Sequence, residues 1–336
     1  FSSGRRQTPT VTSINKPGTI DQNASNGFEW KFGTNTGAGM YHKFDSTAKI
    51  AYPTGYPCEG IIAATFNNDV ALLVGKAIGE DALWTGASGL YGFGLGLQRN
   101  PYHGRAGEFY SDDPFLTGMI GGYETLGAQS KGLYVYNKHF VLNDQDHSRS
   151  YYSSWLDEQT MRQVYLRPFE MAIEIGDAMN VMIAFNKIGK SWGGSNYNLM
   201  TRWLRGEAGM LGFAISDWYE APNENLGYGM LAGTDILDGP SGGSGFTSSN
   251  NADVRFKNCV VQSATRILYT VANSNAMNFI GAGTEILHFE AKWIYYRDVL
   301  LKRFGASLWT IFGLSMAFVV GTAVWTYLDE RKSLMR

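Results

Sequence analysis

The feature that most constrains the fold is an alternation of helical and strand-like segments between residues 68 and 273. Apolar residues recur at helical spacing in 68–84, 113–129, 156–177, 198–207 and 252–273. Short apolar runs typical of buried strands occupy 89–101, 132–140, 178–187 and 211–218, and 227–239 predicts a helix followed by a short strand. Such alternation predicts an α/β fold with a parallel sheet and helical crossovers. The number of repeats favours a (β/α)8 TIM-type barrel over a doubly wound sheet, although periodicity alone leaves closure open.

Several of these strands end in polar side chains. Arg99, Lys138 with His139, Asn186 and Asp217 each follow an apolar run. In a parallel barrel the carboxyl ends of the strands converge on one face, and that face carries the site. We therefore expect Asp217 to point into a pocket shared with Lys138 and His139. The alternative is structural, since Ser216 and Asp217 are residue types that also cap a following helix.

The composition excludes some classes of function. The chain has 336 residues, 17% of them charged, and a net charge of -2, so it offers no basic block for a nucleic-acid partner. Its five histidines are scattered, and Cys58 and Cys259 lie far apart. We therefore expect no metal site and no cofactor, and we interpret the two cysteines as free thiols.

The C-terminal region predicts a single transmembrane helix. Residues 304–328 contain no charged side chain, which is long enough to cross roughly 30 Å of hydrocarbon. The alternative is a buried core helix. Gly313, Ala317 and Gly321 recur at every fourth residue and could form a flat face for another transmembrane helix.

These patterns divide the chain into five expected parts. They are an extended polar, Gly-rich segment (1–48), the barrel (49–288), a juxtamembrane segment (289–303), the transmembrane helix (304–328) and a short charged tail (329–336).

Three motifs resemble those of glycoside hydrolase family 3, the β-glucosidase family. They are KHFVLNDQDHSR (138–149), GRAGEFYSDDPFLTG (104–118) and GFAISDW (212–218), in the family's order. The resemblance runs from about residue 50 to 275 and is greatest to bacterial members whose chain ends in a membrane helix. It implies a (β/α)8 barrel. No counterpart of the first barrel strand is evident before residue 20, so the barrel can be incomplete at its N-terminal end.

The resemblance also implies a chemistry and a set of site residues. The family hydrolyses glycosides with retention, using two carboxyl groups about 5–5.5 Å apart. By motif match, Asp217 is the expected nucleophile. The expected substrate-binding residues are Asp21, Arg105, Lys138, His139, Arg149 and Trp218. Two alternatives stay open: His139 as a core histidine, and Lys138 as a buried ion-pair partner of Asp144.

The chain departs from the family pattern in four places. Asp21 stands in a degraded form of the family's Asp-Gly-Pro motif, and Phe185 replaces a tyrosine whose hydroxyl would reach Asp217. Gly107 stands where an aromatic residue normally precedes Glu108. The family's acid/base Glu lies on a different domain, which no segment of this sequence resembles. We expect that Glu to come from another domain or another chain.

Two functions follow from these observations. The first is a membrane-anchored retaining β-glycosidase that hydrolyses terminal β-linked sugars. Its expected partners are a β-linked glucoside, membrane lipid, a chain or domain supplying the Glu, and other transmembrane helices. The alternative is a catalytically inactive, glycosidase-like subunit with a structural role in a membrane complex. The barrel is expected on the extracytoplasmic side of a single-pass protein. A mitochondrial membrane, after removal of a transit peptide before Phe1, is the alternative location.

Overall fold

The computed structural model describes residues 8, 11–14, 16–23, 25–28, 54–218, 226–238, 253–278 and 292–333. They belong to two units, Phe1–Ala282 and Gly283–Arg336, which are described separately below. The first unit carries the sheet and the candidate site. The second consists of one long helix in its described part.

A six-stranded sheet forms the centre of the first unit. All neighbouring strands pair in parallel, and their order in the sheet is their order along the chain. The strands are β1 (Asp21–Asn23), β2 (Gly89–Tyr91), β3 (Tyr134–Phe140), β5 (Asn180–Ile183), β8 (Ala214–Trp218) and β9 (Ile236–Asp238). Sequential parallel order with helical crossovers is the arrangement of a (β/α) barrel. The described residues supply six of its strands, whereas the sequence pattern predicted eight.

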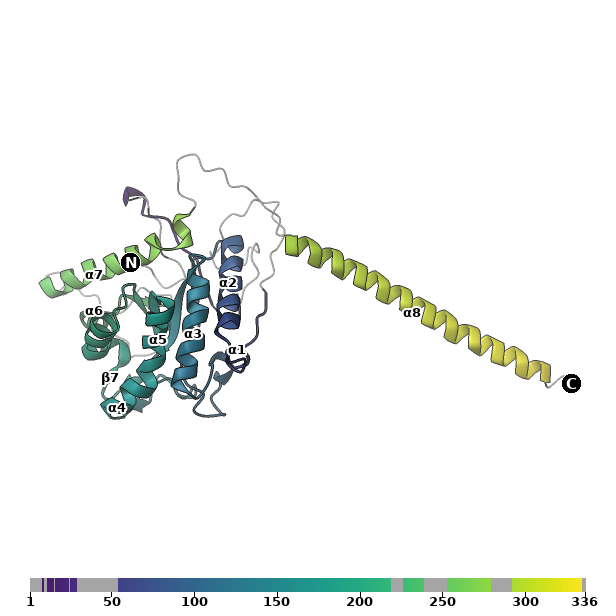
Figure 1. Cartoon of the computed structure of the whole chain (residues 1–336), viewed down its shortest axis with the longest axis horizontal. Helices are drawn as coiled ribbons and strands as arrows, with labels where there is room; N and C mark the ends of the chain where they lie inside the picture. The colour runs from purple at the N-terminus through teal and green to yellow at the C-terminus, as the bar shows by residue number, and fades with distance from the viewer. Residues whose placement is uncertain are drawn as a thin grey trace. The chain divides into compact units, whose positions relative to one another are not determined.

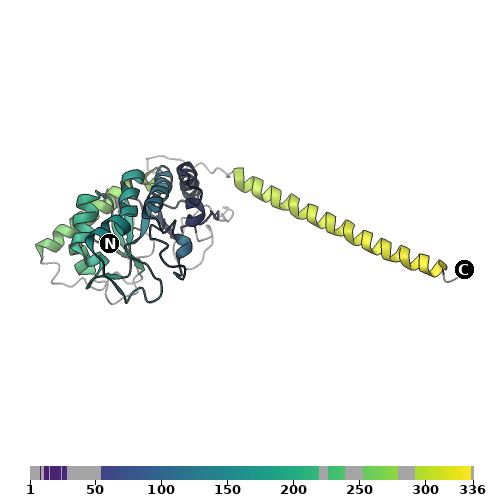
Figure 2. The ribbon, with the colours of Figure 1, turned by 60° about the horizontal axis from the view of Figure 1, so that its bottom comes forward.

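Helices cover one face of this sheet. Helices α2, α3 and α5 lie side by side in the views of Figure 1 and Figure 2. The longer helices are α2 (Asn68–Thr85), α3 (Pro114–Gln129), α5 (Arg167–Gly176), α6 (Leu226–Ala232) and α7 (Val254–Ala272). Short helices α1 (Glu59–Ala63) and α4 (Glu158–Thr160) and two π-helical segments (Met161–Leu166, Asn198–Glu207) complete this layer. The predicted helices are confirmed within one or two residues at each end.

Two differences from the sequence prediction concern the first strands. The expected strand 89–101 is regular only over Gly89–Tyr91, and the chain then continues irregularly beside β3, with Gly94 bridging Lys138. The sheet also begins earlier than expected, because Asp21–Asn23 lies within the segment predicted to be extended and outside the barrel. Three residues are too few for hydrophobic periodicity to reveal a strand.

Aromatic side chains fill the face of the sheet that points away from the helices. Residues of β3 alternate in direction, so Tyr134 and Tyr136 share one face while Asn137 reaches Thr125 of α3 on the other. Tyr136 packs edge to face on Tyr91 and Phe213, with ring centroids 4.8 and 5.3 Å apart. This packing occupies the space inside the curve of the sheet.

The motif around Asp113 has a structural part. Asp113 accepts hydrogen bonds from the N–H groups of Phe115 and Leu116, and Pro114 occupies the first turn of α3. An aspartate cap followed by proline is a strong helix start, because each satisfies or removes an otherwise unpaired N–H group. Residues 113–118 of the motif thus start helix α3. Residues 104–112 precede the helix, and their side chains can contribute to a site.

Glycines allow α2 and α3 to approach closely. A Cβ atom built on Gly75 would lie 2.0 Å from the Glu124 carbonyl oxygen, and one on Gly127 would lie 2.4 Å from the Leu72 carbonyl oxygen. We predict that Gly75→Ala lowers the free energy of unfolding by about 1–3 kcal/mol, because the backbones must separate. Chemical unfolding followed by tryptophan fluorescence measures the change.

Gly206→Ala is the matched control for this prediction. Gly206 also lies in a helical segment, but the nearest atom to its added Cβ is 3.7 Å away. This variant is expected to be neutral or stabilised by up to about 1 kcal/mol. If both variants have the same free energy of unfolding, the close contact between α2 and α3 does not require glycine at position 75.

The second unit contains helix α8 (Lys292–Ser333). Within it, Gly305–Leu328 is long and apolar enough to cross a membrane, by length and composition. Gly313 and Gly321 have no atom within 4 Å of an added Cβ.

Candidate active site

Asp217 lies near the carboxyl end of β8, at the edge of the sheet where β3 also ends. In the register of the sheet, Ser216 pairs with Ile183 of β5, which in turn pairs with Phe140 of β3. His139 is thereby brought beside Asp217, with Nε2 3.3 Å from Oδ2. Among the described residues, the next helix after Asp217 is α6, which begins at Leu226, nine residues later, so Asp217 does not cap it. The carboxylate lies at the carboxyl edge of the sheet, where a (β/α) barrel carries its site.

A cation also stands beside this carboxylate. Nη1 of Arg105 lies 4.0 Å from Oδ2 of Asp217, and the N–H of Trp218 donates to Oδ1 at 2.7 Å. Burial raises the pKa of Asp217 above its usual value, while Arg105, the Trp218 N–H and Arg149 act in the opposite direction. Oδ2 of Asp217 accepts no hydrogen bond from the described residues, although nitrogen atoms of His139 and Arg105 lie within 4.0 Å of it.

Glu108 holds the two cations of the site in place. Arg105 donates to both of its carboxylate oxygens, at 2.9 and 2.8 Å, and Nζ of Lys138 lies 3.3 Å from Oε2. Although burial opposes it, the charge of Lys138 and the charge and hydrogen bonds of Arg105 lower the pKa of Glu108 to about 2. The predicted alternative of a Lys138–Asp144 pair is wrong: the Asp144 carboxylate instead accepts a hydrogen bond from Tyr165 at 2.7 Å.

His139 and Lys138 are both buried, and burial lowers the pKa of each. The shift of His139 is large, since Arg105 and Lys138 add their positive charges to the desolvation. His139 is therefore neutral at pH 7, and Arg105 is a permanent cation beside Asp217.

Arg149 reaches the same site from the loop after β3. Its guanidinium lies 4.3 Å from the ring centroid of Phe185 and 3.0 Å from an Asp146 carboxylate oxygen. An Arg over an aromatic face is attracted to the negative ring face. Phe185 thus supports a positive charge near Asp217, although it lacks the hydroxyl expected at its position.

Trp218 and Asp21 have different relations to this cluster. Trp218 follows Asp217 directly and is 41% exposed, and its backbone N–H makes the described contact with the carboxylate. Asp21 instead accepts hydrogen bonds from Tyr134 and Tyr136, at 2.5 and 2.6 Å, inside the curve of the sheet. Tyr134 precedes His139 by five residues along β3, a rise of about 16 Å. The structure therefore does not bring Asp21 to the other predicted site residues.

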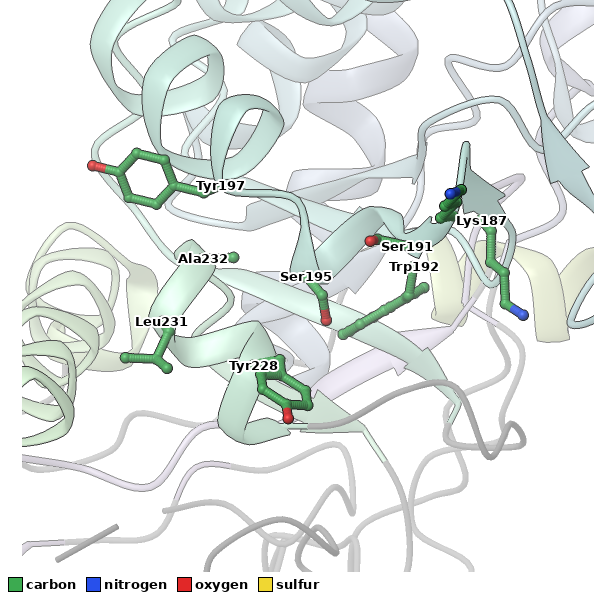
Figure 3. A pocket seen from close by; sticks show the side chains of 9 residues that line it. Lys187, Ser191, Trp192, Ser195, Tyr197, Tyr228, Leu231 and Ala232 are labelled. Atoms are coloured by element: carbon green, nitrogen blue, oxygen red, sulfur yellow. The ribbon is translucent and has the colours of Figure 1, made fainter. Parts of the chain in front are cut away.

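A separate cavity of about 450 Å³ lies between β6–β7 (Lys187–Ile188, Ser191–Trp192) and α6 (Figure 3). Trp192 lines it but is only 2% exposed, and its Nε1 donates to the Ala184 carbonyl oxygen at 2.8 Å. Its role is packing rather than sugar stacking. This cavity is not lined by Asp217 or by the residues grouped around it, which are Arg105, Glu108, Lys138, His139 and Arg149.

Glu108 was not among the predicted site residues, yet it binds both Arg105 and Lys138. The signal was available in its spacing, because Glu108 follows Arg105 by three residues on a 3-10 turn, Ala106–Glu108. Side chains three apart on a helical turn are neighbours. The contact with Lys138, from another strand, could not be read from spacing.

A sequential parallel sheet whose strand ends bring together Asp217, Arg105, Lys138 and His139 has the architecture and the site position of a (β/α)-barrel protein. The chain belongs to glycosyl hydrolase family 3: residues 46–236 match the N terminal domain of that family.

Individual relatives agree with this assignment. The chain is 36% identical to a probable beta-glucosidase I of Emericella nidulans over 184 residues, covering 54% of this chain and 22% of that protein. It is 32% identical to a beta-glucosidase of Ruminococcus albus over 234 residues, covering 66% and 25%. The structure of beta-glucosidase 3B from Thermotoga neapolitana in complex with glucose superposes with a TM-score of 0.69 at 27% identity, covering 81% of this chain and 38% of that one. The chain thus spans between a fifth and a quarter of the length of the curated relatives it matches.

Proposed function

We propose that this chain is the nucleophile-bearing barrel of a retaining β-glycosidase that hydrolyses terminal β-linked glucosides. The observation that carries the proposal is the Asp217 carboxylate at the end of β8, with His139 at 3.3 Å and Arg105 at 4.0 Å. The names of the relatives, which are β-glucosidases, support the substrate class.

The proposed chemistry takes two steps. An Asp217 oxygen attacks the anomeric carbon, the glycosidic C–O bond breaks, and the leaving oxygen takes a proton from a general acid. Water then displaces Asp217 from the glycosyl ester and gives a proton back to the same group. Arg105, Lys138 and neutral His139 are the donors available to the sugar hydroxyls around this point. Trp218 offers an apolar ring face for the sugar.

Glu108 cannot be the general acid of this mechanism. Its pKa of about 2 means that it carries no proton at neutral pH, and both its oxygens are occupied by Arg105 and Lys138. A general acid needs a pKa near the working pH. We therefore propose that another domain or another chain supplies the acid/base Glu.

The test is covalent labelling of the full chain in detergent. A 2-deoxy-2-fluoro-β-glucoside with a dinitrophenolate leaving group needs no general acid, so it isolates the nucleophilic step. The expected result is a glycosyl adduct on the peptide containing Asp217, detected by mass spectrometry. Absence of an adduct with the gluco, galacto and manno reagents would overturn the proposal.

A catalytically inactive subunit is the second candidate function. Two observations favour it: Phe185 provides no hydroxyl to Asp217, and Asp21 is engaged by Tyr134 and Tyr136 inside the sheet. In that case the barrel fold is retained for assembly with a partner. Failure of labelling, together with co-purification of a stoichiometric membrane partner, would establish this candidate in place of the first.

Restoring the hydroxyl at position 185 is expected to strengthen the site. We predict that Phe185→Tyr increases the rate of labelling about fivefold to tenfold, the size of one ordinary net hydrogen bond. The aromatic face under Arg149 is kept in this variant. Labelling time courses measure the rate, and Phe185→Leu, which loses the ring, is expected to be slower than the parent. A Tyr variant no faster than the parent would show that the hydroxyl does not reach Asp217.

We further propose that α8 anchors the chain in a membrane as a single pass, with the barrel on the extracytoplasmic side. The apolar span Gly305–Leu328 supports lipid contact, and Gly313, Ala317 and Gly321 support packing against other transmembrane helices. A mitochondrial membrane is the alternative location. Resistance to alkaline extraction, compared with a chain ending before Lys292, tests the anchor. Release of the full chain by alkali would refute it.

A further inference from the structure

A buried histidine outside the proposed catalytic group ties together the two loops that carry the cations. His103 is 5% exposed and lies two residues before Arg105. Its Nδ1 accepts the backbone N–H of Arg105 at 3.0 Å, and its Nε2 lies 2.8 Å from the Asn143 carbonyl oxygen. Its ring packs edge to face on Phe109, with centroids 5.1 Å apart.

These contacts define the proton position on the ring. A carbonyl oxygen can only accept, so Nε2 donates to Asn143, and the Arg105 N–H can only donate, so Nδ1 accepts. Both bonds are satisfied together by the neutral tautomer with its proton on Nε2. The ring is thereby held at both nitrogens and at its edge.

The two bonded loops carry different parts of the proposed sugar site. Arg105 and Glu108 lie on the segment after β2, whereas Asn143 lies on the loop after β3 that continues to Arg149. Lys138 and His139 belong to β3 itself. Arg105 binds Glu108 of its own segment and also reaches Asp217 of β8, so the position of its backbone decides whether both contacts are made. A bridge between the two loops therefore sets where its guanidinium lies.

We infer that His103 is a positioning residue, which fixes Arg105 against Asp217 by tying the β2 loop to the β3 loop. This inference rests on the proposed function in assigning Arg105 to the sugar. His103 itself does not contact Asp217 in any described interaction. Its effect on the site passes through the Arg105 backbone.

Two conservative variants separate the two bonds. In His103→Asn the Oδ1 atom can accept the Arg105 N–H two residues on, as in an Asx turn, but the side chain is too short to reach Asn143. In His103→Gln the longer side chain can donate to the Asn143 carbonyl while losing the local acceptor geometry. His103→Ala loses both bonds.

The first measurement is amide hydrogen exchange of the full chain in detergent, with fragmentation that isolates Arg105. His103→Ala is expected to increase exchange at the Arg105 amide by at least about tenfold, and His103→Asn is expected to restore protection. The peptide covering β8 should exchange as in the parent. This measurement does not depend on glycosidase activity.

The second measurement is the concentration dependence of labelling by the 2-fluoro-β-glucoside. His103→Ala is expected to raise the half-saturating concentration about fivefold to tenfold while changing the maximal rate less than about twofold, because sugar binding rather than attack is weakened. In an Arg105→Ala background the same substitution should have no further effect, since residues that act through one another are not additive.

The outcomes separate the two proposals. An unchanged Arg105 amide in His103→Ala, or additive effects of the His103 and Arg105 substitutions, would overturn the positioning role. No labelling of the parent chain, together with faster Arg105 exchange in His103→Ala, would overturn the glycosidase proposal and leave His103 as the residue that holds Arg105. A lowered maximal rate at unchanged half-saturation would also contradict the inference.

Discussion

Asp217→Asn is expected to abolish covalent labelling by the 2-fluoro-β-glucoside, with a loss on the order of 10⁴-fold or more, the range found when a nucleophile is removed. The amide occupies nearly the same volume and keeps an oxygen that can accept the Trp218 N–H, which lies 2.7 Å from Oδ1 in the parent. It lacks the negative charge that attacks the anomeric carbon. The measurement is intact-mass detection of the adduct over hours at saturating reagent.

The matched control for this loss is Asp144→Asn. Asp144 is a partly buried carboxylate whose Oδ2 accepts from Tyr165, and it contacts neither His139 nor Arg105 in the described interactions. The substitution removes the same unit of charge. It should leave the labelling rate within about threefold of the parent, because an amide oxygen can still accept from Tyr165. Similar losses in both variants would mean that Asp217 acts only by its charge, and labelling that persists in Asp217→Asn would place the nucleophile elsewhere.

The fold could be predicted from the sequence wherever an element is long and periodic. Helices α2, α3 and α7 have clear apolar spacing and appear where expected, and β8 was evident from its apolar run. β1 was not, because a three-residue strand in a polar segment has too few residues for its period to be recognised. Its place in the sheet depends on pairing with β2, which is a tertiary contact.

The sequence indicated most residues of the candidate site but not the contacts between them. Arg105, Lys138, His139, Arg149 and Asp217 come together as the motifs indicated. Glu108 and His103 did not stand out, because each acts through a partner from another segment of the chain. Asp21 shows the opposite case: a motif position suggested a sugar contact, and the packing of β3 gave the carboxylate two tyrosine donors instead.

Glu108→Gln is expected to destabilise the barrel by about 2–3 kcal/mol at pH 7. Its side chain is 30% exposed, but Lys138, with 3% exposure, loses its partner and becomes an uncompensated buried charge. The folded pKa of Glu108 is about 2, below the ordinary value of 4.5. A lowered folded pKa means that the carboxylate stabilises the fold fully above about pH 4.5 and that this contribution is lost as the pH falls toward 2.

The pH dependence distinguishes this mechanism from a general packing defect. The difference in unfolding free energy between the parent and Glu108→Gln should shrink by about 2 kcal/mol between pH 7 and pH 3. At pH 3 the unfolded parent takes up a proton on Glu108, which favours unfolding, and the variant has no such group. Urea unfolding of the full chain in detergent, followed by tryptophan fluorescence at each pH, measures the difference. A gap that stays constant over this range would contradict the lowered pKa.

Two further variants test the part played by Lys138. Adding Lys138→Met to Glu108→Gln removes the buried charge, so the double variant should regain at least about 1 kcal/mol relative to the single one. Glu80→Gln breaks an exposed pair, in which Glu80 lies 2.8 Å from Lys131, and should cost no more than about 1 kcal/mol. A double variant less stable than Glu108→Gln would mean that Lys138 stabilises the barrel through its packed methylene chain rather than its charge. In that case Glu108 would position only Arg105, and the position of Lys138 would not depend on Glu108.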